Sequence, residues 1–243
     1  MSIAVLTNAD LCARVLAYQP GVPLIARTFL ASWKTMALPH TAADYACKVG
    51  DLAMVRRLQS CDHGTLTPKA MDWAAMHGHL DIVQYLHATG HNGTVDAMDQ
   101  AAKNGHIAVV SFLSANRREG CTSNGYLWAA TQGHVEIIRL LSAKYPYQQW
   151  NGALAIERAA AQGHVAMVQW LLPRQSPLTL QSVLKIAVYH GHIAILQLLL
   201  RSCVLSPALD ETMTTMALHR GHMNVVTLLE AHHTNTLGSL CAV

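Results

Sequence analysis

The chain has 243 residues, of which 51% are hydrophobic and only 13% charged, and its formal net charge is +3. Nucleic-acid binding normally needs a concentrated basic patch, so this weak charge does not favour it. No segment reaches the about 18–20 apolar residues of a membrane span, and the first residues lack the basic start of a secretory signal. Six cysteines occur singly, without a C-x-x-C pair. We therefore predict a cytoplasmic protein, with the nucleus left open, that binds neither nucleic acid nor membrane.

Residues 1–40 precede the periodic part of the chain. Leu11, Val15 and Leu16 fall on one face of a predicted helix, and residues 24–33 predict a second. A stack of repeats needs a terminal element that covers the apolar flank of its first unit. We predict that residues 1–40 form a helical N-terminal cap.

A glycine, usually followed by histidine, recurs along the rest of the chain at gaps of 28, 27, 28, 30, 28 and 30 residues. A near-constant period of this size indicates one supersecondary unit used repeatedly, and stacked units form an extended surface rather than a deep pocket. The seven glycines are Gly50, Gly78, Gly105, Gly133, Gly163, Gly191 and Gly221.

Before each glycine the sequence predicts a short helix of about two turns. An alanine stands four residues before every one of these glycines, where a small side chain lets two helices approach closely. Thr67 and Thr94 suit the N-cap of two such helices, and we expect Asp72 and Asp99 in their first turns, where a carboxylate favours the helix dipole. The glycine then ends the helix in the left-handed conformation.

After each glycine the sequence predicts a second, amphipathic helix. In the second repeat Ile82, Val83 and Leu86 recur at spacings of one, three and four, with polar residues between them. Each unit is therefore expected to be helix, tight turn, helix and loop. Neither helix can bury its apolar face alone, so neighbouring units must stack.

This pattern, A-A-x-x-G-H-L-D-I-V-Q-Y-L at Ala74–Leu86, resembles the ankyrin repeat. The resemblance covers residues 41–233 in about seven repeats and leaves residues 234–243 as a short tail. It implies an all-α, ankyrin-type helix-turn-helix solenoid. It also implies binding of a protein partner on the concave face of the array.

The chain departs from the family's pattern in two ways. The period is shorter than the usual 33 or so residues, so we expect trimmed loops between units and more recognition by the helices. Longer connections are expected near residues 145–152 and 203–210. The family's T-P-L-H stretch is also missing, and its histidine position holds Asp44, Asp72, Asp99, Leu127, Glu157, Lys185 and Thr215.

In proteins similar to this one, partners are met mainly by the variable residues just before each glycine. Aromatic residues next to the packed alanines, namely Tyr45, Trp73 and Trp128, and Trp170 of a second helix, are instead expected in the core. The candidate partner-binding residues are Lys48, Met76, His77, Lys103, Asn104, Thr131, Gln132, Gln162, Tyr189, His190, His219 and Arg220.

The chain has fifteen histidines, six of them directly after the repeat glycines. We expect these six to make backbone hydrogen bonds around the turn. They lack the spacing of a metal site, and no nucleophile or phosphate-binding motif is present. The sequence thus predicts no metal, no cofactor and no catalytic residue.

The function predicted is a non-catalytic protein–protein interaction scaffold, expected to be monomeric, with a partner that the sequence does not identify. An alternative comes from the first 34 residues, which resemble an F-box, the helical module that docks a substrate receptor onto a ubiquitin ligase core. The residues that carry this resemblance are Leu6, Leu11, Val15, Leu16, Tyr18, Leu24 and Trp33.

Overall fold

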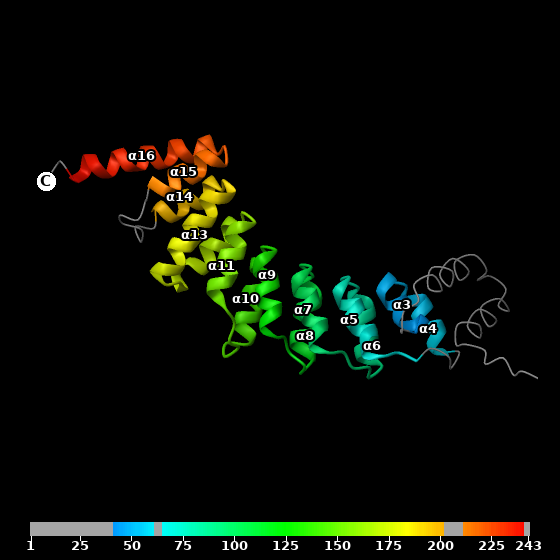
Figure 1. Ribbon diagram of the computed structural model, residues 1–243. Helices are drawn as coiled ribbons and strands as arrows, with labels where there is room; N and C mark the ends of the chain where they lie inside the picture. Colours follow the sequence, from blue (N-terminus) through cyan, green and yellow to red (C-terminus); the bar gives the residue numbers. More distant parts are fainter. Residues whose placement is uncertain (1–40, 61–64, 202–210, 241–243) are drawn as a thin grey trace, which may run out of the picture. The chain divides into compact units, whose positions relative to one another are not determined.

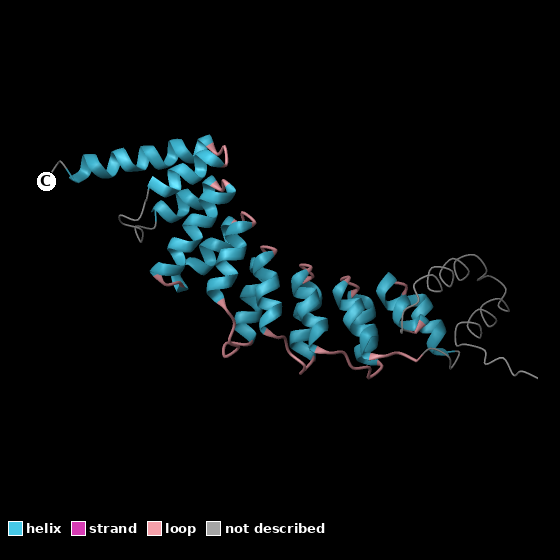
Figure 2. Cartoon of the chain, in the orientation of Figure 1, coloured by secondary structure: helices cyan, strands magenta, loops and turns pink. Residues whose placement is uncertain are grey.

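The computed structural model describes residues 41–60, 65–201 and 211–240. The predicted cap and F-box-like segment, and the longer connection expected at 203–210, lie outside these ranges. Within them, all regular structure is helical (Figure 2). The prediction of an all-α fold is confirmed.

The chain divides into two compact units between Cys121 and Thr122. Each unit is a series of helix pairs, labelled in Figure 1. Unit 1 contains α3 (Ala42–Val49), α4 (Leu52–Ser60), α5 (Pro68–Met76), α6 (Leu80–Ala88), α7 (Val95–Lys103) and α8 (Ile107–Asn116). Unit 2 contains α9 (Ser123–Thr131), α10 (Val135–Lys144), α11 (Gly152–Ala161), α12 (Val165–Leu171) with the 3-10 turn η1 (Leu172–Arg174), α13 (Pro177–His190), α14 (Ile193–Arg201), α15 (Glu211–His219) and α16 (Met223–Leu240).

Within each unit, neighbouring pairs stack in register. In unit 1 the first helices α3, α5 and α7 contact one another in turn, and the second helices α6 and α8 do the same. In unit 2, α9, α11, α13 and α15 form the first row, while α10, α12 and α14 form the second. In Figure 2 the tight turns of each unit lie at one end of its pairs and the longer loops at the other.

The core of each repeat follows the predicted pattern. In the second repeat Ala74, Ala75, Ile82, Val83 and Leu86 are all completely buried. The alanines permit close approach of neighbouring first helices, and the branched side chains fill the space between the two rows. Burial of each such side chain contributes about 1.5–3 kcal/mol before chain entropy is counted.

Helix starts and stops also follow the sequence. Thr67 and Thr94 cap α5 and α7, their hydroxyls accepting from the backbone N–H groups of Lys69 and Asp96. All seven repeat glycines have positive φ, for example +79° at Gly78, which L side chains rarely adopt. This confirms the predicted left-handed turns.

Two helices, α13 and α16, are longer than the sequence predicts. α13 has 14 residues, with Ser176 as its N-cap and Pro177, a residue suited to the first helical position, at its start. At the other end, α16 continues through the segment set apart as a tail, to Leu240.

Candidate binding surface

The turn histidines connect consecutive repeats. The Nε2–H group of His79 donates to the carbonyl oxygen of Lys48 at 3.1 Å, and that of His106 donates to Met76 at 3.1 Å. In unit 2, His192 donates to the carbonyl of Ala161 at 3.0 Å. The predicted bonds around the turn are also present, because the backbone N–H of His79 donates to the carbonyl of Ala74 at 2.9 Å. The ring bonds to the preceding repeat come in addition to these.

The ring of each of these histidines also packs against the turn glycine of the repeat before it. A Cβ added at Gly78 would lie 2.6 Å from Nδ1 of His106, and one at Gly133 would lie 2.7 Å from Cγ of His164. The glycine is therefore required twice, by its positive φ and by the ring packed against it.

The aspartates of the first helices have a different role from the one expected. Asp72 is the fifth residue of α5, whose first turn contains no acidic residue, so the prediction of dipole stabilisation is wrong for it. Asp72 is only 3% exposed, and its carboxylate accepts from the N–H of Thr94 at 2.8 Å and from the Thr94 hydroxyl at 3.0 Å. Burial raises the pKa of Asp72, while these two bonds act against that rise. The carboxylate ties one repeat to the N-cap of the next.

Asp44 makes the equivalent bridge one repeat earlier. It accepts from the backbone N–H and the hydroxyl of Thr67, both at 2.9 Å, and it also closes the capping box of α3 with Thr41. Asp99 likewise is the fifth residue of its helix, where the only first-turn acid is Asp96. An aspartate thus takes the family's histidine position and binds the next cap directly.

The twelve candidate residues are more exposed than this bonded framework, although the backbone carbonyls of Lys48 and Met76 take part in it. Each is exposed or half-buried, whereas the alanines beside them are buried. We call these positions the pre-glycine strip of each unit. In unit 1 the strip consists of Lys48, Met76, His77, Lys103 and Asn104, and in unit 2 of Thr131, Gln132, Gln162, Tyr189, His190, His219 and Arg220.

The strip of unit 1 contains two lysines, Lys48 and Lys103, and no carboxylate. Lys48 Nζ lies 5.5 Å from the centre of the Trp73 ring. Burial, together with the neighbouring His79, Lys48 and His106, lowers the pKa of His77. Asn104 is partly structural, because its amide donates to the carbonyl of Met76 at 2.7 Å.

In unit 2, side chains at the turns around Gly191 and Gly221 contact one another. The Arg220 guanidinium lies 3.6 Å from the centre of the Tyr189 ring, and the rings of Tyr189 and His190 lie 5.1 Å apart. His190 also stacks on His192 at 5.9 Å. Tyr189, His190 and Arg220 are three of the predicted strip residues, and the contact of Arg220 with Tyr189 depends on the stacking of one repeat on the next.

The expectation of core aromatics holds only in part. Tyr45 is buried, but Trp73, Trp128 and Trp170 are half-exposed. A tryptophan is too large for the gap between two closely approaching helices, so its edge stays at the surface.

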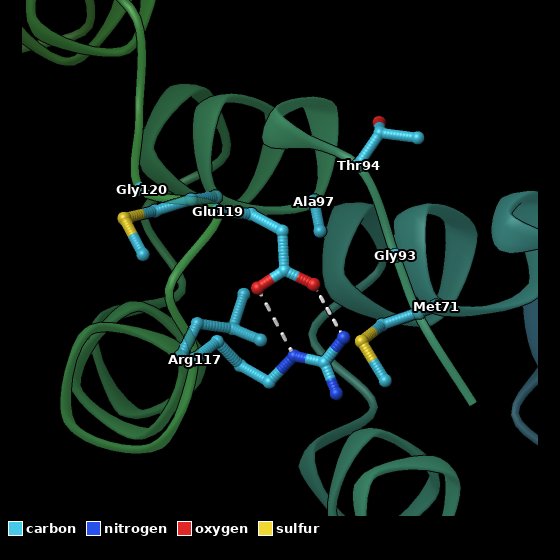
Figure 3. Close-up of a pocket in the computed structure, with 9 residues that line it drawn as sticks. Met71, Gly93, Thr94, Ala97, Arg117, Glu119 and Gly120 are labelled. Carbon is cyan, nitrogen blue, oxygen red and sulfur yellow. Dashed lines mark hydrogen bonds and ion pairs between the residues drawn. The ribbon is translucent and has the colours of Figure 1, made fainter. Parts of the chain in front are cut away.

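A narrow pocket in unit 1 is occupied by an ion pair. Figure 3 shows Arg117 and Glu119 facing each other across it, with Met71 and Thr94 on its wall. Arg117 also donates to the carbonyl of His91 at 3.1 Å and to Oδ1 of Asn92 at 3.3 Å. Burial opposes the ionisation of Glu119, but the hydrogen bond and charge of Arg117, together with the backbone N–H groups of Glu119 and Arg118, outweigh it and lower the pKa of Glu119. The pair therefore joins two loops and offers no open reaction site.

Two further kinds of site, a reactive thiol at Cys47 and a metal site, have no support among the described residues. Cys47 is fully buried, and burial raises the pKa of its thiol to about 12, so it is not a nucleophile. No three His, Cys, Asp or Glu side chains of residues 41–60, 65–201 and 211–240 gather in a way that could hold a metal ion. None of the helices α3 to α16 is long and apolar enough to cross a membrane.

Stacked helix pairs with a fixed inter-repeat framework and variable exposed positions define a helical repeat protein. Family models agree: a model for three copies of the ankyrin repeat matches residues 98–182, and one for many copies matches residues 71–113. Residues 71–182 of the chain are therefore ankyrin repeats. Ankyrin repeats generally mediate protein–protein interaction and are typically non-catalytic. A search among curated proteins found no match to this sequence.

Proposed function

We propose that this chain binds a protein partner through its pre-glycine strips, on the concave face that ankyrin repeats generally present. The observation that supports this proposal is the contrast between neighbouring positions. Alanine, glycine and histidine are taken up in packing and inter-repeat bonds, whereas the strip residues differ from repeat to repeat and remain accessible.

The proposal predicts that charge added to the strip of unit 2 weakens partner capture. Gln132 and Gln162 are exposed positions of this strip, and the double change Gln132→Glu with Gln162→Glu alters charge but not side-chain size. Capture of partners from an extract of the producing cells, quantified by mass spectrometry, is expected to fall at least about fivefold, because an unpaired charge at an interface is costly.

The matched control places the same two charges on the second helices. Gln169 on α12 and Gln197 on α14 are also exposed and belong to the same unit. Gln169→Glu with Gln197→Glu is expected to leave capture unchanged. Loss of partners in the control but not in the strip variant would move the interface to the second helices and refute the proposal.

The F-box-like resemblance supports a second function, recruitment of a ubiquitin ligase core through residues 1–34. Deleting these residues is expected to abolish recovery of ligase subunits in affinity purification while the strip-dependent partners remain. Retention of every partner after the deletion would reject the adaptor function.

A further inference from the structure

The last turns of unit 2 carry a patch of donor-bearing aromatic and cationic side chains. We name Tyr189, His190, His192 and Arg220 the π-cation patch. Tyr189 is 43% exposed, and His190 and Arg220 are exposed as well. His192 is held from below by its bond to the carbonyl of Ala161. The patch is thus anchored at one side and open at the other.

Stacking on the Tyr189 ring orients the Arg220 guanidinium so that it can bind an anion. A guanidinium uses its flat face on an aromatic ring and keeps its N–H edges for acceptors, and the carboxylate is the acceptor whose geometry it matches. The close approach of Arg220 to Tyr189 limits the rotamers that binding would otherwise have to fix. His190 adds a donor nitrogen in either neutral tautomer.

Among the unit 2 residues whose side chains the structure describes, no carboxylate occupies a position of the strip. Every residue one or two positions before a repeat glycine in unit 2 is neutral, histidine or arginine. Glu136 lies on α10, 3.4 Å from Arg139, while Glu157 lies in α11 six residues before its glycine, and Glu230 lies on α16. The charge on this strip is therefore positive and uncompensated by its own residues.

We infer that unit 2 binds an acidic segment of the partner and that the carboxylates of this segment contact the π-cation patch. The inference rests on the proposed function and adds the chemistry of the partner. Tyrosine and arginine are also the residue types that most often dominate the binding energy of protein interfaces. An extended acidic segment lying across the strip satisfies both the charge and the exposed donors.

Unit 2 offers a matched comparison within the same fold. Arg174 of η1 lies 4.4 Å from the centre of the Trp170 ring, so it has the same charge and the same kind of stacking. It lines a groove of the second helices that also contains Glu136 and Arg139. Non-specific attraction of an acidic probe would depend on both arginines, whereas the inferred site depends on Arg220 alone.

The test uses the full chain and a fluorescein-labelled peptide of alternating Glu and Gly. A peptide of about twelve residues spans roughly 40 Å when extended, which is enough to cross several repeats. Saturable binding in fluorescence anisotropy is expected, weakened by added salt and absent for the Gln–Gly peptide. Arg220→Gln is expected to weaken binding by roughly five- to tenfold and His190→Ala by about two- to threefold, whereas Arg174→Gln leaves it unchanged. Circular dichroism melts confirm that each variant is folded.

Three results would overturn the inference: no saturable binding of the Glu–Gly peptide, equal loss with Arg174→Gln, or tighter Arg220-dependent binding of a single-stranded oligonucleotide. Failure here is distinguishable from failure of the proposed function. If the Gln132→Glu and Gln162→Glu variant still loses captured partners, the strip binds a partner that is not acidic. If capture is also unaffected, both proposals fall.

Discussion

Replacing Gly78 by alanine is expected to lower the free energy of unfolding by about 2–5 kcal/mol. One part of this cost comes from the backbone, because φ at Gly78 is +79° and an L residue there is strained by about 1–2 kcal/mol. The second part comes from the neighbouring repeat, because the new Cβ would lie 2.6 Å from Nδ1 of His106. Relief requires the ring to move, which breaks its bond to the carbonyl of Met76 and costs a further 1–3 kcal/mol or so. Urea unfolding of the full chain, followed by circular dichroism, measures the sum.

A variant at Gly90 distinguishes the backbone cost from the cost of the histidine contact. Gly90 has nearly the same φ, +77°, but a Cβ there would have no atom within 4 Å. Gly90→Ala is therefore expected to cost only the backbone part, about 1–2 kcal/mol. In a His106→Ala background the penalty of Gly78→Ala should fall to the same value. Equal penalties for Gly78→Ala and Gly90→Ala in the unaltered chain would show that the histidine ring does not require the glycine.

Replacing Asp72 by alanine is expected to cost about 2–3 kcal/mol, because it leaves the N–H and the hydroxyl of Thr94 without their buried acceptor. The loss lies between two repeats, so it weakens the stacking on which each repeat depends. Asp72→Asn keeps one acceptor oxygen and should cost less. The measurement is again the urea midpoint and slope of the full chain.

Asp96 provides the control for charge alone. It lies in the first turn of α7, half-exposed, 3.9 Å from Lys69, and such surface pairs contribute about 0–1 kcal/mol. The pKa of Asp72 is raised in the folded chain, so its titration lowers stability as the pH rises from the unfolded to the folded pKa. All variants are therefore compared at one pH. Equal losses of unfolding free energy in Asp72→Ala and Asp96→Ala would show that the bond from Asp72 to Thr94 does not stabilise the fold.

Much of this architecture could be predicted from local pattern. Thr67 and Thr94 were identifiable as caps and Gly78 as a left-handed turn, because each of these roles is decided by a few adjacent residues. The apolar spacing around Ile82 likewise predicted the buried face of α6. The candidate strip followed from resemblance to the ankyrin repeat. Its residues are exposed or half-buried, and its role in binding stays a proposal.

The sequence alone therefore determined the repeat, its two helices, its turn and its resemblance to the ankyrin repeat. The tertiary structure decided what the polar residues of the framework do. The two atoms that meet in each contact are far apart in the chain, 22 residues for Asp72 with Thr94 and 30 for His106 with Met76. Only stacking of one repeat on the next brings such atoms within hydrogen-bonding distance. The same stacking places Arg220 of one repeat over Tyr189 of the repeat before it, a contact that the strip positions by themselves did not predict.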